Sequence, residues 1–166
     1  MAAKNELSQA GQVMEAVVDP SNRTIISTRM IDAPVNQVFE AFSNPENLKH
    51  WWGPAGFTNT IDQFDFKPSG TWTFTMHGPD GANYPNRCEF VDIVENRKVI
   101  FIHHLPVHVF TMTLGFEPVG NQTKFSFTMV FEAHGEVERI QQYVVPANEQ
   151  NFDKLESFVY KNLKSS

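Results

Sequence analysis

Two histidines, His103 and His108, are the side chains whose type and spacing best fit a chemical role. They flank Leu105 and Pro106 in the segment FIHHLPVHVF, where a hairpin turn is expected. In a hairpin with an even-length loop, paired residues have numbers that add up to an odd value, so the two histidines are predicted to share one face. Neighbouring imidazoles titrate near neutral pH and influence each other. The pair could transfer protons or anchor a ligand at the mouth of the fold.

Two other interpretations of these histidines remain open. A hairpin tip is commonly exposed, so both could be ordinary surface residues. A zinc site would need a third ligand, which the sequence does not identify. The sequence also has no cysteine pair for zinc, no phosphate-binding glycine loop, no His-Glu-x-x-His and no Gly-x-Ser-x-Gly. We therefore predict no metal, no cofactor and no assigned catalytic residue.

Large apolar side chains in alternating positions form the second group of candidates. In TWTFTMH, for example, Trp72, Phe74 and Met76 alternate with threonines and so share one face of a strand. Such rings and thioethers suit either a core or a ligand pocket. The predicted ligand-binding set is Trp52, Trp72, Phe74, Met76, His103, His108, Phe110, Met112, Phe127, Met129 and Phe158. Six of these are expected to enclose a cavity: Phe74, Met76, Phe110, Met112, Phe127 and Phe158.

Hydrophobic periodicity predicts the elements that hold these residues. Residues 24–31 are rich in β-branched side chains and indicate a first strand. Two short helices follow, beginning at Pro34 and Pro45, and the second ends at Gly53. A period of two from 57 to 131, divided by turn signals, indicates about six more strands. Apolar residues at helical spacing between 137 and 163 indicate a long C-terminal helix.

This order predicts an α+β fold of the helix-grip kind. A curved antiparallel sheet of about seven strands would wrap around the C-terminal helix, with two short helices after the first strand. Trp51 and Trp52 would plug the gap between the sheet and that helix. Residues 1–22 are mostly small and polar and are expected to be a lead-in, while residues 23–166 form a single domain.

Composition narrows the classes of partner. The chain has 19 acidic and 13 basic residues, a net charge of −6, which argues against a nucleic-acid partner. Cys88 is alone, so no internal disulfide is expected and a reducing compartment suits the chain. The start, MAAKNELSQAGQV, lacks a secretory signal, and no run approaches the ~20 apolar residues of a membrane span. We expect a cytoplasmic protein with no membrane contact.

Several segments resemble a known family. The stretches APVNQVFEAFSNPENLKHWWGPAGF and FDFKPSGTWTFTMHGPDG, with the tail helix, resemble the helix-grip fold of the START and birch-pollen-allergen superfamily. Within it, about residues 24–163 are similar to the branch homologous to the C-terminal domain of the activator of the heat-shock chaperone ATPase. Members of this branch usually have a double glycine where this chain has Ser69 and Gly70.

Three functions are consistent with the residues and the resemblance. The first is binding of a hydrophobic small molecule in a cavity between the sheet and the C-terminal helix. The second, implied by enzymes elsewhere in the superfamily, is a cyclase-like or hydrolase-like reaction in the same cavity. The third is a chaperone-associated interaction domain with a role in the stress response, although the activator's separate N-terminal domain has no counterpart in this sequence. A homodimer is also possible. We favour binding over catalysis.

Overall fold

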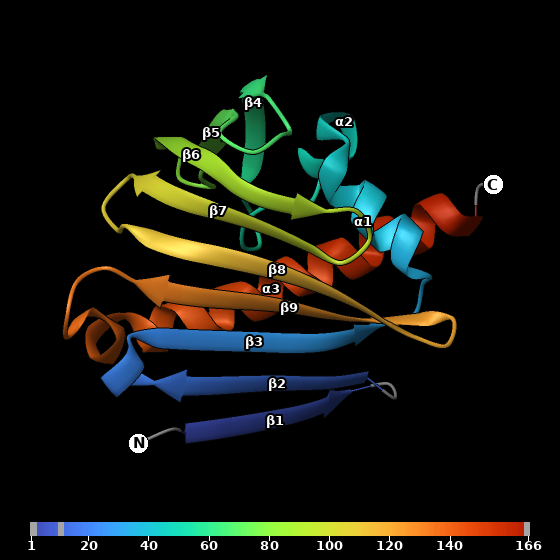
Figure 1. The fold of residues 1–166 in the computed structure, drawn as a ribbon, viewed down its shortest axis with the longest axis horizontal. Coiled ribbons are helices and arrows are strands. Elements are labelled where there is room, and N and C mark those ends of the chain that lie inside the picture. Colours follow the sequence, from blue (N-terminus) through green and yellow to red (C-terminus); the bar gives the residue numbers. More distant parts are fainter. Residues whose placement is uncertain (1–2, 10–11, 165–166) are drawn as a thin grey trace.

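The computed structural model describes the backbone of residues 3–9 and 12–164 and the side chains of residues 15–162 (Figure 1). Within these residues, nine strands form one antiparallel sheet in the order β1-β2-β3-β9-β8-β7-β6-β5-β4. The strands are β1 (Ala3–Gln9), β2 (Gln12–Asp19), β3 (Thr24–Ile31), β4 (Thr58–Phe64), β5 (Thr71–His77), β6 (Asn83–Val94), β7 (Lys98–Leu105), β8 (Phe110–Val119) and β9 (Gln122–Phe131). The helices are the 3-10 turn η1 (Pro20–Asn22), α1 (Val35–Ser43), α2 (Pro45–Leu48) and α3 (Glu136–Lys164).

The predicted helix-grip fold is confirmed, with two corrections. The sheet has two more strands than the predicted seven, because the lead-in folds into β1 and β2 and extends the sheet beyond β3. The second helix is shorter than expected. It ends at Leu48, so Trp51 and Trp52 follow the helix instead of forming part of its face.

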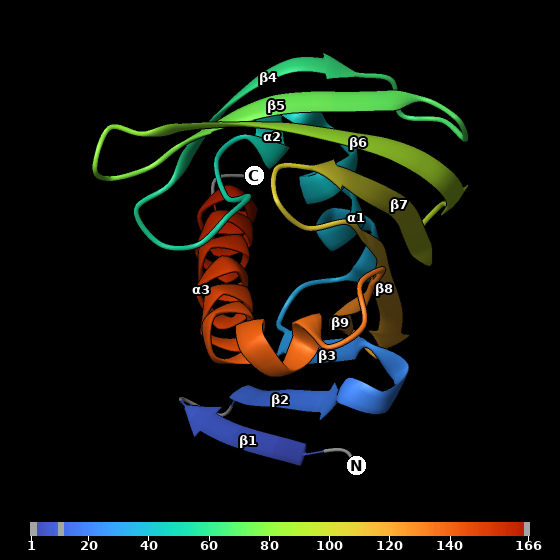
Figure 2. The ribbon, with the colours of Figure 1, turned by 90° about the vertical axis from the view of Figure 1, so that its left-hand side faces the viewer.

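The sheet curves strongly, and α3 lies on its concave side (Figure 2). The register of β6 against β7 shifts twice, between Arg87 and Cys88 and between Phe90 and Asp92. The register of β4 against β5 also shifts, after Ile61. Such irregularities bend a strand and increase its twist. The curvature brings β4 and β5 over the helix instead of leaving them in the plane of β3, while α3 contacts β2, β3 and β9.

Trp52 lies at the centre of the aromatic interior. Its ring centroid is 5.7 Å from that of Phe42 on α1, 5.3 Å from Trp72 on β5 and 5.5 Å from Phe127 on β9. These rings meet edge-on or tilted, the geometry that aromatic quadrupoles favour. Only 9% of Trp52 is exposed. The ring therefore joins three elements that are distant in sequence and plugs this end of the sheet.

Hydrogen bonds fix the segment that carries this ring. The indole N–H of Trp51 donates to the carbonyl of Ala41 on α1 at 2.9 Å. The Trp51 carbonyl accepts from the amide of Asn151 on α3 at 2.8 Å, and the Trp52 carbonyl accepts from the amide of Asn59 on β4 at 2.7 Å. These two carbonyls are buried and have no hydrogen-bond partner within a helix. Leaving either of them without a donor would therefore lower the free energy of unfolding.

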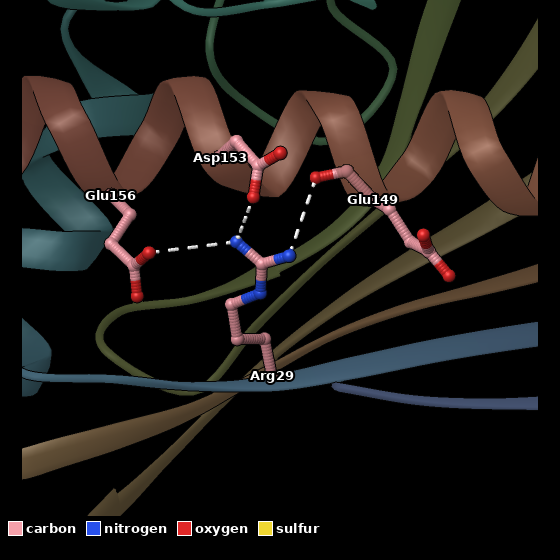
Figure 3. Close-up of polar contacts among 4 residues, drawn as sticks. All are labelled: Arg29, Glu149, Asp153 and Glu156. Atoms are coloured by element: carbon pink, nitrogen blue, oxygen red, sulfur yellow. Dashed lines mark hydrogen bonds and ion pairs between the residues drawn. The ribbon is translucent and has the colours of Figure 1, made fainter. Parts of the chain in front are cut away.

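A buried arginine holds α3 to the sheet (Figure 3). Arg29 on β3 is only 8% exposed, and its Nη1 lies 2.6 Å from the Asp153 carboxylate and 3.6 Å from that of Glu156. Its other terminal nitrogen lies 3.4 Å from the backbone carbonyl of Glu149. The guanidinium also lies over the Phe152 ring at 5.9 Å. Burial raises the pKa of Glu156, and Arg29 opposes that rise.

We expect Trp52→Ala to lower the free energy of unfolding by roughly 3 to 5 kcal/mol, as loss of a large buried ring usually does. Chemical denaturation followed by circular dichroism measures this. Tyr143→Ala is the control, because that side chain is 69% exposed and should change stability by about 0.5 kcal/mol or less. A Trp52→Ala curve that matches the wild type would contradict the central packing role.

We expect Arg29→Met to cost roughly 2 to 4 kcal/mol of stability, because it leaves the largely buried Glu156 carboxylate, whose side chain is 17% exposed, without its cation. Adding Glu156→Gln should restore part of that loss, since no buried charge then remains. Asp153→Asn is the matched control, because its side chain is 66% exposed and should contribute about 1 kcal/mol or less. If the double variant were no more stable than Arg29→Met, the buried-charge explanation would be wrong.

Candidate functional site

Most of the predicted ligand-binding residues lie on the inner face of the sheet. The buried members are Trp52, Trp72, Phe74, Met112, Phe127 and Met129, and the half-buried members are Met76 and Phe110. The buried rings pack directly on one another, as the 4.5 Å separation of the stacked Trp72 and Phe74 rings illustrates. Side chains therefore occupy the interior where the sequence predicted a cavity wall.

Phe158 lies apart from the other predicted residues. It stacks on His50 with ring centroids 6.0 Å apart, on the flank of α3 that faces α2. It separates two surface grooves, of about 340 Å³ and about 630 Å³, whose other walls are mainly polar side chains such as Asn47 and Lys154. The expectation that Phe158 shares a cavity with the sheet residues is therefore corrected.

His103 occupies the middle of an inward-facing row that crosses five strands. In order, the paired residues are Trp72, Cys88, His103, Phe110 and Phe131. The imidazole stacks on Phe110 at 4.6 Å and is only 9% exposed. Its inward direction agrees with the hairpin argument, because His103 pairs with Phe110 and their numbers add up to an odd value.

Both ring nitrogens of His103 have partners. Nε2 lies 2.9 Å from the side-chain oxygen of Asn86 on β6. Nδ1 lies 2.8 Å from the backbone carbonyl of His108. Burial lowers the pKa of His103, and the contact with the His108 carbonyl opposes that effect. A neutral imidazole at neutral pH follows from the larger of these effects.

His108 does not share a strand face with His103, which corrects the predicted side-chain pair. β7 ends at Leu105 and β8 begins at Phe110, so His108 lies in the connecting loop. Its Nδ1 is 2.5 Å from the carboxylate of Glu136, the first residue of α3. The His108 side chain is 34% exposed, whereas that of Glu136 is 10% exposed. The loop therefore links β7 to the start of the helix.

Asn86 and Glu136 are the polar residues that the sequence did not identify. Asn86 alternates with Cys88 and Phe90 on the inner face of β6, but its contact with His103 depends on how β6 pairs with β7, which local patterns do not give. Glu136 follows a turn at Gly135, and its contact with His108 depends on how α3 returns to the sheet. The only local signal was the helical pattern beginning at Val137, which makes Glu136 a first-turn residue.

Several apolar residues that pack against the core are only half-buried. Four of them, Met76, Phe110, Ile140 and Val144, belong to β5, β8 and the first half of α3. Ile140 follows Glu136 by one helical turn and so lies on the same flank of α3, beside the β7–β8 loop. We call these four residues and the adjoining His103 the open end.

The open end could support acid–base chemistry as well as binding. A histidine whose Nδ1 is held by a carboxylate is a plausible general base through Nε2. Cys88 does not supply a nucleophilic thiolate, because burial raises the pKa of its thiol and keeps the thiol protonated. Among residues 3–9 and 12–164, no group of three or more His, Cys, Asp or Glu side chains could hold a metal ion.

The lowered pKa of His103 predicts a pH dependence of stability. Since the unfolded chain binds the proton more readily, the contribution of His103 is present above its ordinary value of 6.5 and is lost as pH falls. We expect the wild type to lose more stability on acidification from about pH 7.5 to about pH 5 than His103→Gln does, by up to about 1.4 kcal/mol per pH unit. His104→Gln, a change at the neighbouring residue, should behave as wild type. Parallel curves for all three proteins would contradict this linkage.

Comparison with known proteins agrees with the fold. A structure of a protein from Arthrobacter aurescens superposes with a TM-score of 0.82 at 20% identity, covering 88% of this chain and 91% of that one. A protein from Nitrosomonas europaea gives 0.76 at 19% identity, covering 86% and 97%. CalU16 from Micromonospora echinospora gives 0.62 at 16% identity, covering 99% and 88%. At these identities the similarity establishes the fold alone.

Family membership rests on the sequence. None of the curated proteins matches the chain. Within the part of the chain that is described, no helix has the length and apolar character needed to cross a membrane. The family model of the Activator of Hsp90 ATPase homolog 1-like proteins matches residues 32–159, which run from the end of β3 almost to the end of α3. The chain therefore belongs to the family of Activator of Hsp90 ATPase homolog 1-like proteins.

Proposed function

We propose that this protein binds a hydrophobic small molecule at the open end, between the sheet and the first half of α3. One observation carries the proposal. Met76, Phe110, Ile140 and Val144 pack against the core but remain half-buried, so apolar surface is left accessible. Burying such surface contributes roughly 25 cal/mol for each Å² removed from water. A ligand that covered these side chains would gain this free energy.

The residue types at the open end support the same proposal. Met76 is flexible, and the ideal Cβ position of Gly53 would lie only 2.4 Å from its methyl carbon, so the thioether occupies space that a larger residue would fill. Flexible thioethers adapt to ligands of different shape. Phe110 presents a ring beside the polar contacts of His103. An apolar wall with a few placed polar groups is typical of small-molecule sites.

The construction of α3 also favours binding at this end. In the second half of α3, the Asn151 amide donates to the Trp51 carbonyl at 2.8 Å, and the Lys154 ammonium donates to the Phe57 carbonyl at 2.9 Å. The first half precedes Pro146 and is attached through apolar packing and the Glu136 contact with His108. Entry of a ligand there would disturb fewer buried hydrogen bonds.

Catalysis is the second candidate function, and a single observation favours it. The carboxylate of Glu136 orients His108, whose side chain stays partly accessible at the edge of the open end. Such a pair could activate water or remove a proton from a bound substrate. Binding remains the better-supported proposal, because the described side chains around His108 supply no evident group to stabilise a developing oxyanion, which usually contributes more than the base.

Naphthyl methyl ether, an apolar probe without a hydrogen-bond donor, tests the binding proposal. We expect saturable quenching of tryptophan fluorescence in the wild type, weakened at least about tenfold by Ile140→Asp, because the new carboxylate would have to lose its hydration. Gln142→Asp places the same charge on the exposed side of the same helical segment and should leave the affinity unchanged.

Two results would contradict the proposed site. One is unchanged affinity in an Ile140→Asp variant that melts as the wild type does. The other is loss of binding in Phe158→Ala, which would move the site to the grooves on the flank of α3. Absence of any saturable binding would contradict the function itself.

A further inference from the structure

A lysine on α3 lies in the wall of a groove and has no carboxylate partner. Lys154 lines the larger groove on the flank of α3, whose volume is about 630 Å³. Its side-chain nitrogen lies 2.9 Å from the carbonyl of Phe57 and 3.3 Å from that of Pro54. The preceding residue, Asp153, pairs with Arg29 instead. Among the residues whose side chains are described, no carboxylate lies within ion-pair distance of Lys154.

The surroundings of Lys154 increase the fraction of its amine that is neutral. Burial lowers the pKa of Lys154, because removing an ammonium group from water is unfavourable. Both protonation states can donate to the two carbonyls, since a neutral amine still has two N–H groups. The neutral amine also has a lone pair, which is left over for a molecule in the groove. Lysines with a lowered pKa are the ones that act as nucleophiles in proteins.

The groove has room for a small molecule and offers part of it an apolar wall. Phe158 and Ala55 line it, and the His50 ring lies 6.0 Å from that of Phe158 and nearly parallel to it. Polar side chains such as Gln150 and Asn162 complete the wall. Small-molecule sites usually have volumes of about 300 to 1,000 Å³. The groove therefore suits a small carbonyl compound with an apolar body.

We propose that Lys154 captures small aldehydes in this groove as imines. The Nζ lone pair attacks the carbonyl carbon, and the π electrons of the C=O bond move to the oxygen, which takes a proton from Nζ. As the C=N bond forms, the new hydroxyl group leaves and takes the remaining Nζ proton with it as water. One amine and one aldehyde give one imine and one water, so the step needs no oxidant or reductant.

The contacts of Lys154 are compatible with such an adduct. A protonated imine keeps one N–H, which can still donate to the nearer carbonyl, that of Phe57. The Pro54 carbonyl, at the longer distance, loses its donor, but Pro54 is only half-buried and water can replace the amine there. The groove lies along the second half of α3, away from the open end. This inference is therefore independent of binding at the open end.

Reductive trapping with naphthaldehyde and cyanoborohydride tests this inference on the full chain. Cyanoborohydride converts an imine into a stable amine, and peptide mapping by mass spectrometry shows which lysine carries the naphthylmethyl group. At neutral pH we expect Lys154 to be modified at least about tenfold faster than Lys67, whose side chain is 68% exposed. The reason is that more of the Lys154 amine is neutral and the groove holds the ring beside it.

Lys154→Arg is the decisive variant, because a guanidinium can still donate to both carbonyls but does not form an imine under these conditions. We expect it to abolish the fast modification and to leave the rate at Lys67 unchanged. Lys67→Arg makes the same chemical change at an exposed lysine and should leave the rate at Lys154 unchanged. Ile140→Asp, which tests the open end, should also leave that rate unchanged, so the two proposals can fail separately.

Two results would overturn the inference. One is modification of the lysines in proportion to their exposure, which would show ordinary surface amine chemistry only. The other is a rate at Lys154 that rises with pH in parallel with the rate at Lys67, since a lowered pKa makes the rate level off at a lower pH. If Lys154→Arg does not fold, the map of modified lysines in the wild type still decides between these outcomes.

Discussion

One helix covers the concave face of the sheet, and its attachment is uneven along its length. Arg29 reaches Asp153 from β3, while Asn151 and Lys154 bond to the backbone of the segment after α2, so these polar contacts follow Pro146. The carboxylate of Glu156, also near Arg29, is much less exposed than that of Asp153, and an ion pair that is largely buried is costly to break even where it adds little net stability. The contacts therefore fix where the second half of α3 lies, and the first half is free to meet the sheet through apolar surface.

The aromatic rings around Trp52 determine which part of the interior is filled by side chains. Trp52 follows a very short helix, and its ring reaches across to Trp72 and Phe127. Rings of this size can span the gap between a curved sheet and a helix, which leaves no need for a ligand there. Beyond them, the row through His103 includes the half-buried Phe110. The aromatic residues thus fill the space between the sheet and α3 at the end near α1 and α2.

Local sequence patterns predicted the parts of the fold that depend on local geometry. Alternation and one turn were enough to place His103 on the inner face, since the parity of a hairpin fixes its register. They did not single out Asn86, although it alternates with Cys88 and Phe90, because its contact with His103 depends on the pairing of β6 with β7. They also missed β2, whose side chains show little alternation and which is a strand because the edge of β3 is available to it. The contact of Glu136 with His108 depends on tertiary packing, which short-range periodicity cannot predict.

Affinity and selectivity at the open end have different physical origins. Apolar area contributes in proportion to its size and does not distinguish an alcohol from an ether of similar shape. A buried acceptor without a donor costs roughly 1 to 3 kcal/mol, which is large enough to separate these two ligands. At the open end, His103 lies between the oxygen of Asn86 and the carbonyl of His108, so both of its ring nitrogens already have partners within the protein. A ligand there meets mainly apolar side chains, and the apolar area that it covers determines most of its affinity.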